Sequence, residues 1–244
     1  MKKRLDILLV ERGLARTRSH AQALVMAGRV KGYSKAGAEV DETAELEVAP
    51  GPRFVSRGGE KLAGALAALG VVVAGEDCLD VGASTGGFSD CLLQAGAARV
   101  CALDVGYGQL DPRLRSDRRV TVLERMNVRR LSPGDLPFRP SFVTCDVSFV
   151  GLAKALPPAL VCARAGWRAL VLVKPQFEAG PANVGKGGVV RDPFVQRRVL
   201  DTLRAAAPAW GAEVVGEVES PLLGPKGNRE FFLYLRDRGD GRAS

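Results

Sequence analysis

Four charged residues stand where an apolar segment ends or begins, and their types suit acid–base chemistry. The apolar run "RALVLV" leads to Lys174 and then to a proline, which cannot continue the hydrogen bonds of a strand. Asp146 ends a second apolar run, Glu230 opens a third, and Lys61 opens the helix predicted from "SRGGEKL". Each of them alone is an ordinary solvated charge. Together, amines beside carboxylates could hold and move the proton of a hydroxyl group.

A glycine-rich loop joins an apolar strand to a helix in "CLDVGASTGGFSD", residues 78–90. Ligands of open α/β sheets bind at such loops, at the carboxyl ends of the strands. A P-loop needs lysine where this chain has Phe88, and a dinucleotide fingerprint needs glycine where it has Ser84. S-adenosylmethionine is the cofactor class that remains, with a structural turn as the alternative. The candidate cofactor residues of the loop are Asp80, Gly82, Ser84, Gly86 and Phe88.

Three further side chains are candidates for cofactor binding. Asp104 ends the run "RVCALD", 22 positions after Gly82. An acidic residue about 20 positions after a glycine loop can accept hydrogen bonds from both ribose hydroxyls of an adenosine, and a helix cap is the alternative. Asn127 follows the next short strand, where an amide could meet an adenine edge. Asp146 is expected to touch the cofactor as well as the reacting groups.

Strands and helices alternate from residue 60 onward, which predicts a mostly parallel α/β sheet covered on both faces. The last two strands are expected to form an antiparallel pair, because the stretch between them is too short for a crossover helix. The expected strands span 77–81, 99–104, 120–123, 141–146, 168–173, 212–219 and 230–236, and the expected helices span 87–96, 151–163 and 192–209.

The N-terminal segment has a different pattern. It predicts helices over 5–13 and 21–27, the second capped by Thr17 or Ser19, and strands in "RVKGYSKAG" and "TAELEVAP". Residues 1–35 hold nine Lys and Arg against two acidic residues, a local charge of +7. An excess of this size suggests a polyanion partner, with nucleic acid ahead of a membrane surface. A solvated basic helix pair is the alternative.

Resemblance to known families adds to this interpretation. The N-terminal pattern resembles the small RNA-binding module of ribosomal small-subunit protein four. Lys-Asp-Lys-Glu on these elements resembles the catalytic tetrad of the RrmJ/FtsJ-type ribose 2′-O-methyltransferases. The motifs "SRGGEKL", "DVGASTGGF", "ALDVGYGQL", "LVKPQFE", "GKGGVVRD" and "SPLLGPKGNREFF" make nearly the whole chain similar to the TlyA, or hemolysin A, family of rRNA cytidine 2′-O-methyltransferases.

The resemblance implies a Rossmann-like class I methyltransferase fold with a seven-stranded sheet. The implied domains are an RNA-binding module over 1–52, a linker over 53–59 and a methyltransferase domain over 60–238. The implied catalytic residues are Lys61, Asp146, Lys174 and Glu230, and the implied RNA-binding residues are Arg4, Arg16, Arg18, Arg29 and Lys31. Lys174 would either remove the proton of the ribose hydroxyl or steer that hydroxyl as a cation.

The implied partner is ribosomal RNA or a ribosomal subunit, and the short C-terminus favours large-subunit rRNA alone. A membrane-active hemolysin and a non-catalytic ribosome-binding protein are the alternatives. We expect a cytoplasmic protein, because no stretch reaches the ~20 apolar residues of a membrane helix and no secretory signal fits the N-terminus. His20 is the only histidine, and no two of the five cysteines form a C-x-x-C pair, so no metal is expected.

Overall fold

The computed structural model describes residues 1–239, which divide into two compact units, Met1–Pro52 and the chain from Arg53 onward. The first unit holds β1 (Lys2–Arg4), α1 (Leu5–Glu11), α2 (Arg18–Met26) and β2 (Glu39–Asp41). Strands β1 and β2 are antiparallel, and buried apolar residues of both helices form the core of this unit. The Thr17 hydroxyl accepts a hydrogen bond from the His20 amide and so caps α2, as the sequence predicted.

Both strands expected in this unit are wrong. Residues 29–37 and 43–50 form no strand, and only an isolated bridge joins Val30 to Val48. The two strands that are present, β1 and β2, were not predicted. Each of them has three residues and carries charges, so the alternation of apolar and polar residues that marks a strand is too short to be recognised.

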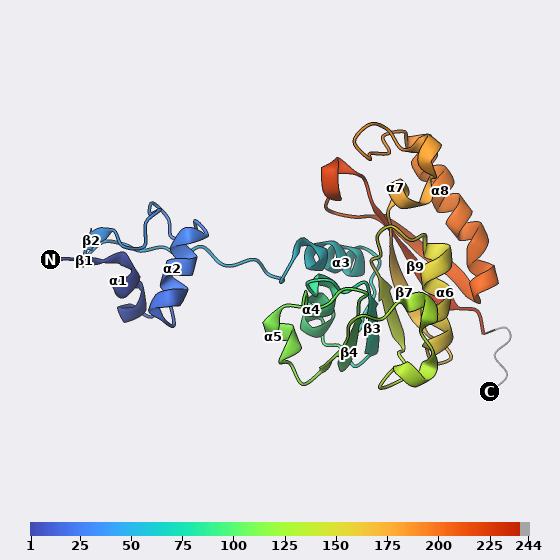
Figure 1. The fold of residues 1–244 in the computed structure, drawn as a ribbon, viewed down its shortest axis with the longest axis horizontal. Coiled ribbons are helices and arrows are strands. Elements are labelled where there is room, and N and C mark those ends of the chain that lie inside the picture. The colour runs from blue at the N-terminus through green and yellow to red at the C-terminus, as the bar shows by residue number, and fades with distance from the viewer. Residues whose placement is uncertain (240–244) are drawn as a thin grey trace. The chain divides into compact units, whose positions relative to one another are not determined.

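The second unit is built on a seven-stranded sheet in the order β5-β4-β3-β6-β7-β9-β8 (Figure 1). The strands from β3 to β7 are parallel, whereas β9 runs antiparallel to β7 and β8. The expected class, a mostly parallel Rossmann-like sheet with an antiparallel pair at one edge, is therefore confirmed. The strands are β3 (Asp77–Val81), β4 (Arg99–Leu103), β5 (Val120–Leu123), β6 (Phe142–Cys145), β7 (Arg168–Val173), β8 (Ala212–Glu219) and β9 (Phe231–Asp237).

Helices cover both faces of this sheet. They are α3 (Arg57–Ala68), α4 (Gly87–Gln94), α5 (Pro112–Arg115), α6 (Leu152–Cys162), α7 (Pro175–Glu178) and α8 (Pro193–Ala206), with short 3-10 segments η1 (Val128–Arg130), η2 (Pro133–Asp135), η3 (Pro181–Asn183), η4 (Ala207–Trp210) and η5 (Pro225–Gly227). Helix α3 begins inside the expected linker 53–59, and Phe54 in that stretch is buried. None of the described helices is long and apolar enough to cross a membrane.

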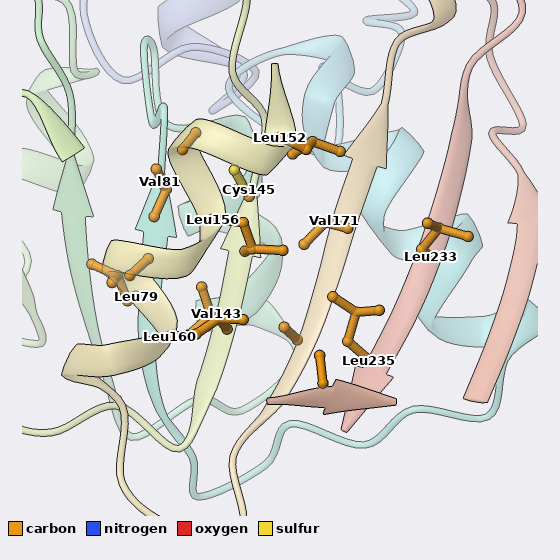
Figure 2. Packing of buried hydrophobic residues seen from close by; sticks show 14 of the residues in the cluster. Leu79, Val81, Val143, Cys145, Leu152, Leu156, Leu160, Val171, Leu233 and Leu235 are labelled. Carbon is orange, nitrogen blue, oxygen red and sulfur yellow. The ribbon is translucent and has the colours of Figure 1, made fainter. Parts of the chain in front are cut away.

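Alternating strand residues build two cores. Leu79, Val143 and Val171 point to the face covered by α6 and α8, where Leu156 and Leu160 of α6 pack over them (Figure 2). The intervening strand residues point to the opposite face and pack against α3 and α4. All five cysteines are free and buried. Two packed faces fix the sheet, so the loops at the carboxyl ends of its strands have a rigid base.

The strand order reverses between β3 and β6, the neighbours on which the two halves of the parallel sheet are built. Connections from these strands leave in opposite directions, which opens a crevice at their carboxyl ends. The glycine loop follows β3, Asp146 follows β6 directly, and Lys174 follows β7. The fold therefore brings the predicted cofactor loop and two of the four predicted catalytic residues to one edge of the sheet.

Candidate active site

Lys174 and Asp146 form an ion pair at the carboxyl ends of adjacent parallel strands. Lys174 Nζ lies 2.5 Å from Asp146 Oδ1 and donates a hydrogen bond of 3.0 Å to Ser148 Oγ. The Lys174 side chain is only 12% exposed. Pro175 follows it at the start of α7 and ends the strand, so the backbone turns away while the amine stays over the crevice.

Lys61 and Glu230 form a second pair, which is more deeply buried. Lys61 lies in α3 and Glu230 directly precedes β9, and Lys61 Nζ is 2.6 Å from Glu230 Oε2. Glu230 Oε1 is buried without a hydrogen-bond partner. The other side of this carboxylate is covered by Gly224, where any Cβ would collide with Glu230 Oε1. Glycine at this position lets the loop before β9 close over the pair.

Three cavities meet around these pairs. The first, of about 540 Å³, lies between the loops after β3, β4 and β6. The second, of about 350 Å³, lies between the glycine loop and the start of α3 and includes Lys61. The third, of about 470 Å³, includes Lys174. Gly82, Ser84 and Asp146 line both the first and the second cavity, and Ser148 and Phe149 line both the first and the third.

The path of the glycine loop depends on a close contact between Gly82 and the backbone of Asp146. Gly82 has a φ of +84°, and a Cβ there would collide with the carbonyl oxygen of Asp146. Only glycine permits both the backbone angle and the contact. The Ser84 amide, from a residue with φ of +49°, donates to Asp104 Oδ2 over 2.8 Å, and the Gly106 amide donates to Asp104 Oδ1 over 2.7 Å. These bonds hold the Asp104 carboxylate at the cavity wall.

Most of the predicted cofactor residues meet in the first two cavities. Gly82, Ser84, Asp104, Asn127 and Asp146 line the first cavity, and Phe88 lines the second. Asp80 and Gly86 line neither of them. Gly86 instead caps α4 in the left-handed region, at φ +95°. A single sequence shows that these residues share a loop, but not which of them face the ligand.

Asp80 is directed into the protein interior. It is fully buried, and its two oxygens accept hydrogen bonds from Ser89 Oγ at 2.7 Å and Thr144 Oγ1 at 3.0 Å. These bonds join β3 to α4 and β6. Burial raises the pKa of Asp80 to about 6, and the two hydroxyls offset only part of that effect. Asp80 is therefore a structural carboxylate beneath the glycine loop.

The raised pKa predicts that Asp80 makes stability depend on pH. The folded protein binds this proton more tightly than the unfolded chain, whose reference pKa is 3.8. Proton binding by Asp80 therefore contributes fully to the free energy of unfolding below pH ~4. This contribution, about 3 kcal/mol, is lost as the pH rises through ~6. Asp80→Asn lacks this titration. The free energy of unfolding can be measured by urea unfolding, followed by the fluorescence of Trp167 and Trp210. Between pH 4 and 7 the variant should become more stable relative to the wild type. A difference in free energy that does not change with pH would contradict this.

Sequence reasoning missed several residues of these cavities. Val105, Met126 and Val128 provide apolar walls in the first cavity, and Arg57 lines the second. Ser148, which binds Lys174, was missed although it stands two positions after Asp146. The position of Ser148 in the sequence could have indicated its role, because residues immediately after parallel strands gather at the binding edge of the sheet.

The predicted RNA-binding residues of the first unit are partly engaged in its own structure. Arg4 and Arg18 both bind Asp6, at 2.9 and 3.0 Å, and Asp6 is fully buried. The hydrogen bond from Arg4 comes first among the interactions that hold the pKa of Asp6 well below its usual range, and bonds from Gln22 and Arg18 add to it. Arg18 is nonetheless half exposed, so its charge still faces solvent.

The other three candidate RNA-binding residues lie at the surface. Arg29 donates to the Ala49 carbonyl oxygen at 2.7 Å, Lys31 pairs with Glu47 at 2.9 Å, and Arg16 is exposed. An ion pair between exposed side chains contributes little to stability. Lys31 can therefore exchange its ion pair for a phosphate at little cost, and the exposed Arg16 can also reach one, whereas Arg29 is partly buried and held by two hydrogen bonds to Ala49.

Comparison with known families accounts for both units. The model of the FtsJ-like methyltransferases matches residues 54–237, and that of the S4 domain matches residues 3–31. This chain belongs to the FtsJ-like methyltransferase family. The expected Rossmann-like methyltransferase fold agrees with this match. As an FtsJ-like methyltransferase, the protein belongs to a class whose members use S-adenosylmethionine.

The names of individual relatives are more specific than the descriptions of the family models. The chain is 48% identical to the 16S/23S rRNA (cytidine-2′-O)-methyltransferase TlyA of Mycobacterium tuberculosis, over 97% of this FtsJ-like chain and 91% of that protein. It is 38% identical to Hemolysin A of Brachyspira hyodysenteriae, over 95% and 99% of the two chains. A solved structure from Streptococcus thermophilus that carries the name hemolysin has a TM-score of 0.75 at 42% identity, covering 97% and 88%. The expected membership of the TlyA, or hemolysin A, family is confirmed.

Proposed function

We propose that this protein transfers a methyl group from S-adenosylmethionine to the ribose 2′-hydroxyl of a cytidine in ribosomal RNA. The observation that carries the proposal is the Lys174–Asp146 pair, which stands where the first and third cavities meet. The relatives named TlyA carry this activity in their names. We also propose residues 1–52 as the RNA-binding module, 53–59 as the junction and 60–238 as the catalytic domain.

The residues of the first cavity fit S-adenosylmethionine. Each Asp104 oxygen accepts one backbone amide and keeps a lone pair for a ribose hydroxyl. Gly82 lets the glycine loop approach the Asp146 carbonyl oxygen more closely than a Cβ would allow, and Asn127 lines the same cavity. When bound, the cofactor supplies an electrophilic methyl group on a positively charged sulfur. Asp146 lines both the first and the second cavity, and its negative charge would attract the positively charged cofactor.

Lys174 would act on the acceptor hydroxyl. Asp146 and Ser148 hold its amine from two sides, which fixes its direction. In this position the amine could remove the hydroxyl proton or orient the oxygen by donating a hydrogen bond, and positioning alone contributes strongly to the rate. Lys61, held by Glu230, lines the second cavity together with Arg57. These two cations suit a phosphate of the RNA backbone.

Ribosomal RNA as substrate suits the basic first unit, since its Lys and Arg residues can neutralise phosphates. We accordingly expect the protein to act in the cytoplasm, where ribosomes are assembled. The prediction of large-subunit rRNA alone stays a prediction, because relatives are named both for 16S/23S and for 23S rRNA. The membrane-active alternative rests on the names of relatives. Among the described residues, no group of three or more His, Cys, Asp and Glu could hold a metal ion.

Mapping of 2′-O-methyl groups on rRNA tests the proposal. Ribosomes from cells with and without the protein should differ at one or a few cytidines. Complementation with the wild type should restore these methyl groups, whereas Asp146→Ala should not, because that change removes the carboxylate shared by the reacting groups. Identical methylation maps with and without the protein would exclude the function, and the subunit that carries the marks decides the large-subunit prediction.

A further inference from the structure

The third cavity lies beside Lys174 and combines apolar with polar side chains. Its apolar lining residues are Phe149, Phe177, Val184 and Pro225, and its other polar lining residues are Ser148, Gln176, Lys226 and Asn228. The rings of Phe149 and Phe177 lie 5.0 Å apart at 51°. Phe149 is 91% exposed and has a φ of +67°, in the left-handed region that non-glycine residues rarely occupy. Exposed aromatic rings and backbone strain both concentrate at ligand sites.

Gln176, which lines this cavity, has a side-chain oxygen without a hydrogen-bond partner. This atom, Oε1, is buried. A buried acceptor without a donor is unfavourable, and it calls for an explanation in a ligand or a partner. Asn228, the other amide of the cavity, is already occupied, because its side chain bonds Val190 and the carbonyl oxygens of Gly188 and Pro225. Gln176 is therefore the amide left to meet a ligand.

We propose that the third cavity receives the base of the target nucleotide and that Gln176 Oε1 accepts a hydrogen bond from the exocyclic amine of cytosine. This inference rests on the proposed function. A ribose hydroxyl held at Lys174 leaves its own base within one sugar's length of the amine, and the third cavity opens there. Flat, unstacked bases are commonly held against aromatic side chains. The second cavity, with Arg57 and Lys61, suits a phosphate better than a base.

Gln176 then makes the site selective for cytidine over uridine. Cytosine presents an amine where uracil presents a carbonyl oxygen, so an acceptor faces a donor in one case and another acceptor in the other. A site built to accept a hydrogen bond rejects the ligand that lacks the donor, because its own polar group stays unpaired. We expect a preference for cytidine of roughly 10- to 100-fold in kcat/KM, the range of one well-placed polar contact.

The test compares two substrates and three forms of the full-length protein. Ribosomal subunits are prepared from cells that lack the enzyme and whose rRNA carries the mapped target as cytidine or as uridine. The wild type is compared with Gln176→Met, which keeps the length of the side chain but has no acceptor, and with Gln176→Glu, which accepts hydrogen bonds only. The ratio of kcat/KM for the two targets is the readout, because it cancels any loss of folded enzyme or of overall RNA affinity.

We expect the wild type to prefer cytidine, Gln176→Met to bring the ratio near one, and Gln176→Glu to keep the preference. An unchanged ratio in Gln176→Met would overturn the inference, as would equal methylation of both targets by the wild type, which would mean that the amide turns over to pair with either base. Both of these outcomes leave the proposed function standing. Absence of methylation by the wild type on the cytidine substrate would instead refute the proposed function itself.

Discussion

Lys174→Ala is expected to abolish methyl transfer while S-adenosylmethionine still binds. The variant removes the amine that Asp146 and Ser148 hold at the junction of the cavities. A positioned acid–base group contributes roughly 10²- to 10⁴-fold to a rate, so we expect a loss of at least ~10³-fold in single-turnover methylation of ribosomal subunits.

Cofactor binding should survive this change for an electrostatic reason. Asp146 still lines the first cavity after Lys174 is removed, and its carboxylate then has no cation beside it. A positively charged ligand is attracted at least as strongly to such a site. Isothermal titration with S-adenosylmethionine should therefore give a dissociation constant within a few-fold of that of the wild type.

Lys154→Ala is the matched control, because Lys154 is an exposed lysine of α6 that lines none of the three cavities. It should keep full activity. Full turnover by Lys174→Ala would refute the assignment of the catalytic amine. A variant that has lost cofactor binding as well as activity would show that Lys174 holds the first cavity together and would equally contradict the expected separation.

Charge reversal at Arg4 and Arg18 is expected to unfold the first unit and thereby to abolish RNA binding indirectly. Both guanidinium groups bind Asp6, which is fully buried. Their replacement by glutamate leaves a buried carboxylate without its cations and surrounds it with like charge, and buried charges must be paired. A unit of 52 residues has little stability to spare.

Arg16→Glu is the informative comparison, because Arg16 is exposed and its side chain is not part of the Asp6 cluster. We expect this variant to keep the unit folded and to weaken RNA binding, with a lower slope of log Kd against log salt as one phosphate contact is lost. Hydrogen exchange of the amides of α1 and α2 in the full chain separates the two cases. Fast exchange is expected in the Arg4→Glu, Arg18→Glu variant and native protection in Arg16→Glu.

Two results would contradict these expectations. Native protection of α1 and α2 in the double variant would mean that Asp6 does not need its cations. Unchanged RNA affinity in Arg16→Glu would remove Arg16 from the RNA-binding residues. The double variant alone cannot reveal the RNA surface, since Arg4 and Arg18 serve the fold of the unit as well.

The sequence alone was sufficient to predict the strands and the longer helices of the second unit, but not the short helices α5 and α7. Every strand expected there is present to within one residue at either end, because long apolar runs and the turns between them are local signals. Lys174, Asp146 and the glycine loop were placed correctly at the carboxyl ends of strands for the same reason. Short charged strands such as β1 and β2 carry no such signal, and they were missed.

Only the tertiary structure determined which side chains meet. Lys61 and Glu230 are 169 positions apart, and their contact depends on how α3 packs against the sheet. Asp80 belongs to the glycine motif but is directed into the core, because the pleat of β3 points it toward Ser89 and Thr144. Gln176 follows Lys174 closely, yet its unpaired oxygen is visible only once the cavity around it is formed. Neighbours in sequence share an element, whereas partners across the site are set by packing between elements, and no local pattern records them.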